Sequence, residues 1–438
     1  METSNTTDDF HFLIKAHIRY SLRCLRLLPS PYESDDNNRL TFGFFSIGSL
    51  SLLGSIDRLN QEEKDDYLHW IYERWDSDSG GFTGHPNVDL RIHSNPEESL
   101  NQPHITHTYA ALLLLALLST PQSDNPKPTN PYTALDVPKL LKFVVDCQRP
   151  NGSFGPFPTS TEQDVRFVYC ATAILEILNI DPKTVIDVQS TGKFPNRINF
   201  FCNLITDFQS CIFENQRYDG GYGQAPFLES QGGTTYCVLA ALKLLNKLDD
   251  SLSSEDALET ARWLVHRQNE FHDLPDEESD EESNTRQDEI NSSNLKTEPV
   301  KASEPSGVSS LTQIQPLVAG FQGRPGKILD ACYSFWCTAA LSIIQEHHSL
   351  KDINSIPGPL LHDPEANIKF LMLCQSKQWG GIARFPEDHP DVYHNYLALG
   401  SISLSYALLS DLENPLVEHH SVLNVPIKTV NWIKKCFP

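Results

Sequence analysis

The run GRPGKILDACYSFW (residues 323–336) places a carboxylate and a thiol two positions apart, at Asp330 and Cys332. Taken alone, this pair also fits a helix N-cap followed by a buried cysteine, so it is a weak metal signal. His394, in DVYHNY, adds an imidazole. Carboxylate, thiolate and imidazole together suit Zn²⁺, and three protein ligands leave the fourth coordination position open, as in catalytic zinc sites.

An open zinc ion has two common uses. It can activate a water molecule, which would also require a nearby general base, or it can hold an incoming thiol as the nucleophilic thiolate. The metal ligands alone do not choose between them.

Cations come just before the metal ligands, where Arg324 and Lys327 stand three residues apart in a Gly/Pro-rich turn. Such a pair is usually a solvated surface feature. Beside a zinc site, however, the two side chains could hold a diphosphate, and Tyr333 could add a phenolic donor. These groups would then stabilise the charge that develops on a leaving diphosphate.

The elements that must position these residues form a repeat. Five apolar segments with helical spacing share an aromatic anchor near their start, and the anchors are 60, 67, 100 and 60 residues apart. A weaker first copy covers 40–53, with Phe45 as its anchor. The segments are 106–118 (anchor Tyr109), 166–178 (Tyr169), 234–245 (Tyr236), 334–344 (Trp336) and 394–404 (Tyr396).

Gly-rich turns and amphipathic segments, such as 137–148 and 257–268, separate these apolar helices. Helices that are apolar on nearly all sides are buried on all sides, whereas the helices of an open solenoid keep a solvated face. The sequence therefore predicts an all-α protein. We expect an α–α barrel of about six helical hairpins, with apolar helices in an inner ring, amphipathic ones in an outer ring, and a central apolar cavity.

The anchors also give the register of the polar residues. In each repeat the unusual polar side chains come within two turns before the anchor, so equivalent repeats would place them at one mouth of the barrel. Asp330, Cys332 and His394 should meet there, above a cavity lined by the aromatic anchors. A diphosphate clamp, an aromatic cavity and a thiolate-binding zinc suit the alkylation of a thiol by a long isoprenyl diphosphate. No convincing DDxxD pair for a magnesium-bound diphosphate is present.

Length, net charge and composition narrow the class of protein. The chain has 438 residues and a net charge of −23, which argues against general nucleic-acid binding. Residues 273–304 hold eleven acids, three bases and no aromatic residue, so we interpret 273–312 as an acidic, disordered insertion into one domain formed by 1–272 and 313–438. No targeting or transmembrane segment is expected, and the ten scattered cysteines suggest free thiols or metal ligands. A cytoplasmic location is predicted.

The run GFQGRPGKILDACYSFW (320–336) resembles the β subunits of protein prenyltransferases, and HITHTY (104–109), EQDVRFVYC (162–170), ESQGGTTYC (229–237) and DVYHNY (391–396) fit the same family. The resemblance covers nearly the whole chain outside the insertion. It implies an α–α barrel paired with a helical α subunit, and transfer of farnesyl or geranylgeranyl to a cysteine in a C-terminal CaaX box of proteins such as small GTPases.

Site residues follow from the matching motifs. Asp330, Cys332 and His394 are implied as zinc ligands, Arg324, Lys327, Tyr333 and Gln231 as diphosphate contacts, and Arg384 as a cation in place of magnesium. His104, Glu162, Arg166 and Tyr393 are implied as protein-substrate contacts. The isoprenoid diphosphate is further expected to touch Thr41, Phe45, Tyr109, Tyr169, Gly232, Gly233, Cys237, Pro325, Gly326, Ser334, Phe335 and Trp336.

Two differences favour the type I geranylgeranyltransferases of this family. Farnesyltransferases carry a tryptophan at the position of Thr41, which shortens the pocket, and an aspartate that binds Mg²⁺ at the position of Arg384. The resemblance therefore implies a C20 substrate, one zinc per β subunit and no magnesium. Gln231 stands where the family usually has a histidine, and Tyr393 is the residue that farnesyltransferases have.

We therefore expect a type I protein geranylgeranyltransferase β subunit that binds geranylgeranyl diphosphate. Three alternatives remain: a farnesyltransferase β subunit, a non-catalytic helical scaffold that binds partners through the acidic insertion, and a zinc hydrolase.

Overall fold

The computed structural model describes residues 10–85, 102–121, 129–180, 218–272, 317–351, 361–409 and 411–437. The predicted insertion 273–312 lies outside the described residues. Helices dominate the described chain, and none of those helices is long and apolar enough to cross a membrane.

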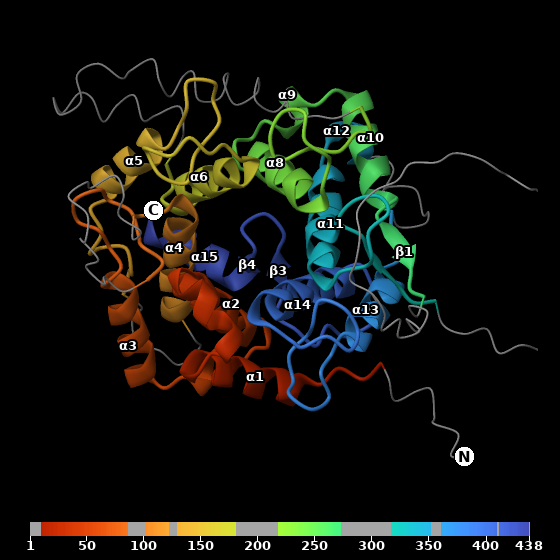
Figure 1. Ribbon diagram of the computed structural model, residues 1–438, viewed down its shortest axis with the longest axis horizontal. Helices are drawn as coiled ribbons and strands as arrows, with labels where there is room; N and C mark the ends of the chain where they lie inside the picture. The colour runs from red at the N-terminus through yellow and green to blue at the C-terminus, as the bar shows by residue number, and fades with distance from the viewer. Residues whose placement is uncertain are drawn as a thin grey trace, which may run out of the picture.

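Six helices form a closed inner ring around the middle of the molecule (Figure 1). Each contacts the next in chain order, and the last contacts the first, so the ring has no open edge. This confirms the predicted α–α barrel. The inner helices are α2 (Arg39–Leu52), α4 (Ile105–Ser119), α6 (Val165–Ile177), α8 (Gly232–Leu244), α11 (Ala331–Ile344) and α14 (Val392–Tyr406).

Burial on all sides explains why the inner helices are apolar all round. Every residue of α4 from His107 to Leu118 is buried. Neighbouring inner helices also approach closely where a small residue allows it. A Cβ atom on Gly48 of α2 would lie 2.5 Å from the ring of Tyr396 on α14, so only glycine fits this contact.

Amphipathic helices form the outer ring. In α5, for example, Leu140, Leu141, Phe143 and Val144 are buried against the inner ring, whereas Lys142 is exposed. The outer helices are α1 (Ile14–Arg26), α3 (Gln61–Tyr72), α5 (Val137–Asp146), α10 (Ser254–Val265) and α13 (Pro364–Leu373). Short elements join the rings: η1 (Ser30–Asn38), η2 (Ile56–Arg58), α9 (Leu248–Ser251), α12 (His348–Lys351), and the antiparallel pair β1 (Gln268–Glu270) and β2 (Ala319–Phe321).

Polar N-cap residues gather at one end of the barrel, where the inner helices begin. The side chains of His104, Asp164, Asp330 and Asp391 each accept a hydrogen bond from a backbone N–H in the first turn of their helix. Gln231 occupies the same position before α8. Helix N-termini carry partial positive charge, so their convergence favours an anionic ligand at this mouth.

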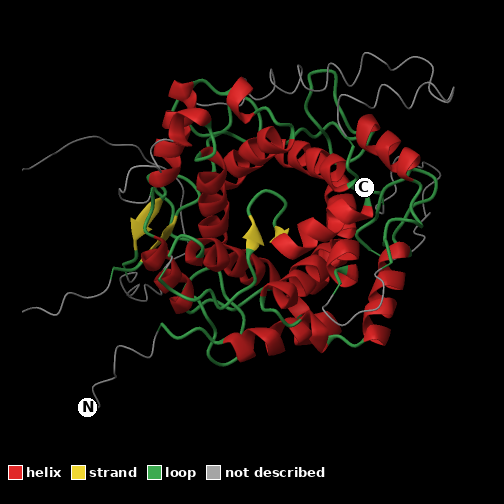
Figure 2. Ribbon diagram, turned by 180° about the vertical axis from the view of Figure 1, so that it is seen from behind, coloured by secondary structure: helices red, strands yellow, loops and turns green. Residues whose placement is uncertain are grey.

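A hairpin from the C-terminal part of the chain closes the opposite end of the barrel (Figure 2). It consists of β3 (His419–His420), a turn, and β4 (Val425–Pro426), and leads into α15 (Ile427–Cys436). Four tyrosine hydroxyls from four inner helices donate to carbonyl oxygens of this turn: Tyr109 to Leu423, Tyr169 to Val422, Tyr236 to Ser421 and Val422, and Tyr396 to Asn424. The hairpin is therefore fixed as the floor of the barrel.

Candidate active site

Asp330, Cys332 and His394 meet at the mouth, although the histidine comes from a different repeat. One ligand atom from each lies within 4.8 Å of the others, and the His394 Nε2 atom is 3.4 Å from an Asp330 carboxylate oxygen. Local structure sets these positions. Asp330 is the N-cap of α11 and accepts a hydrogen bond from the Cys332 N–H, while His394 lies in the first turn of α14. Asp330, Cys332 and His394 therefore come together as the equivalence of the repeats predicts.

Asp391 orients the histidine. One carboxylate oxygen accepts from the His394 N–H at 2.9 Å, and the other lies 2.6 Å from Nδ1. This contact holds Nδ1 and directs Nε2 toward Asp330 and Cys332, as the outer partners of metal-ligating histidines do. Burial by itself lowers the pKa of His394, but the hydrogen bonds to Asp330 and Asp391 outweigh it and raise the pKa to about 9.

The charges of the other two groups follow from their surroundings. Burial raises the pKa of the Asp330 carboxyl, but its hydrogen bonds to His394 and Cys332 outweigh that effect, so the net pKa is lowered. Burial, reinforced by the Asp330 charge, raises the pKa of Cys332 well above its ordinary value. The thiol is therefore protonated unless a cation displaces the proton. The donor set, the 4.8 Å convergence and the oriented imidazole all fit a zinc ion.

The two predicted diphosphate-binding loops lie side by side. The Gly232 N–H donates to the Gly323 carbonyl at 2.9 Å, which joins the QGG turn (231–233), where α8 begins, to the GRPGK turn (323–327). A Cβ atom on Gly323 would come within 2.3 Å of the Tyr333 ring, so this glycine lets the loop pass over the phenol. Burial raises the pKa of Tyr333 to about 12, which keeps the hydroxyl as a proton donor.

The cations of the GRPGK turn are accessible. Lys327, Pro325 and Gly326 are exposed, whereas Arg324 is half-buried and forms an ion pair with Glu229, which precedes the QGG turn. Sequence reasoning missed Glu229, because its partner lies 95 residues away along the chain.

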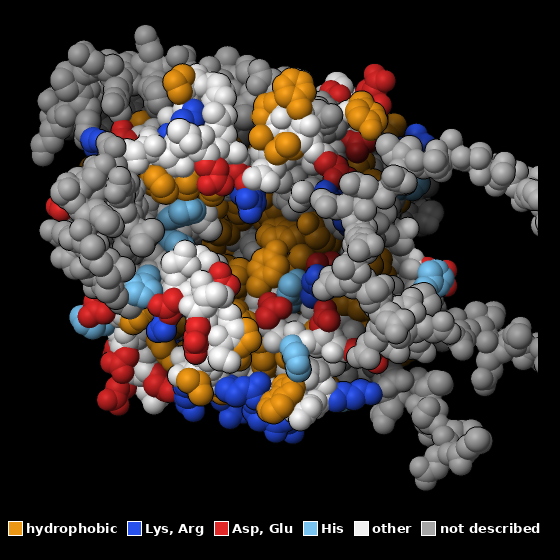
Figure 3. Space-filling model, viewed as in Figure 1, with side chains coloured by type: hydrophobic (Ala, Val, Ile, Leu, Met, Phe, Trp, Pro, Cys, Tyr) orange, Lys and Arg blue, Asp and Glu red, His pale blue; other side chains and the backbone are white. Residues whose placement is uncertain are grey.

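An aromatic wall begins next to the metal ligands. The Trp336 Nε1–H donates to the Tyr393 hydroxyl at 3.2 Å, and the Tyr393 ring stands edge-on to Phe45 with centroids 5.4 Å apart. Thr41 lies one helical turn before Phe45 on α2 and is half-buried. The space-filling view shows a hollow in the middle of this face with hydrophobic side chains in it (Figure 3).

Other predicted wall residues lie deeper. The hydroxyl oxygens of Tyr109 and Tyr169 lie 2.9 Å apart, and both hydroxyls are within hydrogen-bond distance of the floor hairpin, so their polar ends are occupied. Cys237 is buried, with 5% of its surface exposed. Ser334 and Phe335 are fully buried, and their contact with the isoprenoid stays a prediction.

The residues predicted to contact the protein substrate form a second group at the mouth. Arg166 is exposed, and its guanidinium is held by the buried carboxylate of Asp164. The His104 ring stands edge-on to Phe167 with centroids 5.6 Å apart, and its Nδ1 accepts from the Thr106 N–H. Burial, aided by the Arg166 charge, lowers the pKa of His104 to about 4, so it is neutral. Glu162 is exposed.

Arg384 adjoins the start of α11. Its carbonyl accepts from the Ala331 N–H at 2.8 Å, one residue after Asp330, and its exposed guanidinium lies 3.4 Å from Asp388. The backbone of Arg384 therefore lies beside the start of α11, and its side chain pairs with Asp388.

The comparisons with known proteins agree with the fold. Residues 12–425 match the model of the prenyltransferase alpha-alpha toroid domain. The chain is 30% identical, over 89% of its length and 84% of the relative's, to the geranylgeranyl transferase type-1 subunit beta of Arabidopsis thaliana. It is 24% identical to the protein farnesyltransferase subunit beta of Schizosaccharomyces pombe, over 90% of this chain and 79% of that protein.

Among solved structures, the fold matches Candida albicans protein geranylgeranyltransferase-I complexed with GGPP. The TM-score is 0.66 and the identity 23%, and the match covers 98% of this chain and 100% of that one.

Proposed function

We propose that this chain is the β subunit of a type I protein geranylgeranyltransferase. The chain belongs to the prenyltransferase alpha-alpha toroid family and is a prenyltransferase β subunit. The observation that carries the proposal is the convergence of Asp330, Cys332 and His394 at the mouth of an apolar hollow. The substrates would be geranylgeranyl diphosphate and a protein with a C-terminal CaaX box, in the cytoplasm. A helical α subunit would complete the enzyme.

Asp330, Cys332 and His394 would hold the zinc ion. When bound, zinc supplies Lewis-acid chemistry that keeps the substrate's cysteine sulfur as a thiolate at neutral pH. Asp391 maintains the orientation of His394 for this purpose.

The diphosphate would lie against the joined GRPGK and QGG turns. Arg324 would leave Glu229 and take the diphosphate in a bidentate contact, Lys327 would add a point charge, and Gln231 a neutral hydrogen bond. As sulfur bonds to C1 of the prenyl chain, the C1–O bond breaks and its electron pair leaves with the diphosphate. Tyr333, Arg324 and Lys327 would stabilise that charge, and Arg384 would act where relatives use magnesium.

Chain length depends on the aromatic wall. Thr41 is small and stands one turn from Phe45, which favours a C20 chain. A second candidate, farnesyl transfer, draws support from Tyr393, because its ring packs against Phe45, its hydroxyl accepts from Trp336, and the side chain takes up volume at the wall.

The test is single-turnover transfer of C20 and C15 diphosphates to a Cys-a-a-Leu peptide after co-expression with a family α subunit. Preference for C20 without added magnesium is expected, and preference for C15 would refute the type I assignment. Cys332→Ala should abolish transfer and zinc binding at the mouth while the helical content stays unchanged. A non-catalytic scaffold would show no activity and no zinc at the mouth, and a zinc hydrolase would be active without any isoprenoid.

A further inference from the structure

A second group of metal-binding side chains lies at the end of the barrel away from the mouth. Asp249 belongs to α9, which directly follows inner helix α8, and His347 and His348 lie where inner helix α11 passes into α12. We propose that Asp249, His347 and His348 form a second binding site for a divalent transition-metal ion. This site would join the connections of two consecutive hairpins.

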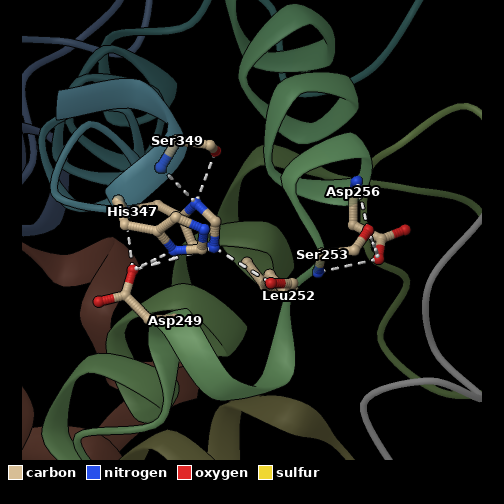
Figure 4. Close-up of polar contacts among 7 residues, drawn as sticks. Asp249, Leu252, Ser253, Asp256, His347 and Ser349 are labelled. Carbon is tan, nitrogen blue, oxygen red and sulfur yellow. Dashed lines mark hydrogen bonds and ion pairs between the residues drawn. The ribbon is translucent and has the colours of Figure 1, made fainter. Parts of the chain in front are cut away.

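The donor atoms already converge (Figure 4). One ligand atom from each of the three residues lies within 4.8 Å of the others. An Asp249 carboxylate oxygen is 3.2 Å from His348 Nδ1 and 3.9 Å from His347 Nε2. The Leu252 carbonyl oxygen is 3.1 Å from the same His347 Nε2, and provides a fourth donor.

These separations are close to those between ligands of one ion. Zinc bonds to nitrogen and oxygen of ~2.0–2.1 Å in a tetrahedron place neighbouring ligand atoms roughly 3.3 Å apart. Two of the separations, 3.1 and 3.2 Å, already have this value, and the 3.9 Å separation would have to contract by about half an ångström. Asp249 and His348 are exposed and can move, whereas His347 is fully buried and serves as the fixed anchor.

The hydrogen bonds of His347 permit the change of tautomer that metal binding requires. Without a metal, Nδ1 accepts from the Ser349 N–H at 3.3 Å, and the Nε2–H donates to the Leu252 carbonyl. A metal at Nε2 needs the proton on Nδ1 instead. The Ser349 hydroxyl oxygen lies 2.7 Å from Nδ1 and can accept that proton's hydrogen bond, as an outer partner does in known sites.

The donor set selects the class of ion. Two imidazole nitrogens with carboxylate and carbonyl oxygens suit Zn²⁺, Ni²⁺ or Cu²⁺, and not the all-oxygen sites of Ca²⁺ or Mg²⁺. The site contains no sulfur, in contrast to the mouth, where Cys332 contributes a thiolate. That difference makes the two sites separable by spectroscopy.

A simpler interpretation is that Asp249 only caps α12, because its carboxylate accepts from the His348 N–H at 2.7 Å. Asp249→Asn and His348→Gln distinguish the two, because both variants keep a side-chain oxygen acceptor at 249 and the backbone donor at 348. Asp250→Asn is the matched control. Asp250 stands next to Asp249 on α9, but its carboxylate pairs with Lys247.

The experiment titrates the chelator-treated full-length chain with Co²⁺ and with Zn²⁺, and counts bound metal per chain after equilibrium dialysis. We expect two metal ions in the wild type and in D250N, and one in D249N and in H348Q. In the Co²⁺ titration, one equivalent should give a thiolate charge-transfer band and the other should bind without one.

Cys332→Ala should remove the thiolate band and still bind one ion. Binding of a single ion by the wild type, or of equal numbers by wild type, D249N and H348Q, would overturn the proposal. The readout is metal stoichiometry, so it is independent of any transferase activity.

Discussion

Zinc binding at the mouth is expected to tighten about a hundredfold per pH unit between pH 6 and 8. Metal binding there must displace two protons. One is held by His394, whose pKa the carboxylates of Asp330 and Asp391 raise to about 9. The other is on the Cys332 thiol, whose pKa burial raises well above its usual range. Asp330 contributes none, because its pKa is lowered and it is already ionised.

The magnitude follows from the number of protons. Each displaced proton changes the metal affinity tenfold per pH unit, or ~1.4 kcal/mol, so two give ~2.7 kcal/mol per unit. Below pH 9 the affinity therefore rises with a slope of two on a logarithmic scale. Above about pH 9 the imidazole is neutral before the metal arrives, and the slope should fall to one.

The assay is competition with a chelator of known pH dependence, combined with calorimetry in buffers of different ionisation enthalpy to count the released protons. Asp391→Asn removes one of the two charges beside the imidazole, so it should lower the pKa of His394 and move the change of slope to lower pH. Asp388→Asn is the control, because Asp388 pairs with Arg384 and touches neither proton.

A slope of one or less in the wild type between pH 6 and 8 would refute this reasoning. It would mean that either the imidazole or the thiol is already deprotonated in the metal-free chain.

Glu229→Gln should tighten the binding of geranylgeranyl diphosphate up to about fivefold at low salt, because in the wild type the exposed ion pair of Glu229 with Arg324 must break before Arg324 can bind the diphosphate. Fluorescence titration measures this affinity, and weaker binding by the variant would contradict the prediction. Tyr169→Phe should lower the free energy of unfolding by about 1 kcal/mol, since its hydroxyl donates to the floor hairpin. Urea denaturation measures this, with Tyr406→Phe, whose hydroxyl has no hydrogen-bond partner among the described residues, as the control. The free energy of unfolding should also fall as the pH drops from 6.5 to 4. Burial lowers the pKa of several histidines to about 4 in the folded chain, so they stay neutral there, whereas in the unfolded chain they bind protons in this pH range. Circular dichroism across this pH range measures it, and constant stability would contradict it; the histidines are His17, His104, His362 and His420.

The barrel could be predicted because the apolar pattern of each inner helix is a local property of the sequence. The inner helices must be apolar on all sides, so their positions are visible in the sequence, and the predicted segment 106–118 lies within the helix Ile105–Ser119. The site could be predicted because each repeat starts with a polar N-cap. Asp330 is such a cap, and the equivalence of the repeats brings it to the same mouth as His394.

Contacts with the backbone and between distant side chains could not be predicted in the same way. The tyrosine anchors were expected to line the cavity, but their hydroxyls bond carbonyl groups, which every residue carries and no sequence pattern marks. The pairing of Glu229 with Arg324 depends on how two loops approach each other. Asp391 did have a signal, because an aspartate three residues before a metal-ligating histidine on a helix start can reach its ring.

The floor hairpin has a consequence for biosynthesis. The Tyr109 hydroxyl finds its acceptor at Leu423, 314 residues further along the chain. The inner helices α4, α6 and α8 therefore leave the ribosome long before the carbonyl groups that accept hydrogen bonds from their tyrosine hydroxyls exist. Until that stretch is translated, these helices lack the floor hairpin, and their apolar inner faces are exposed to water and to other chains. We expect the nascent chain to depend on chaperones most strongly in this interval. That dependence should end only when residues 421–424 have entered the barrel.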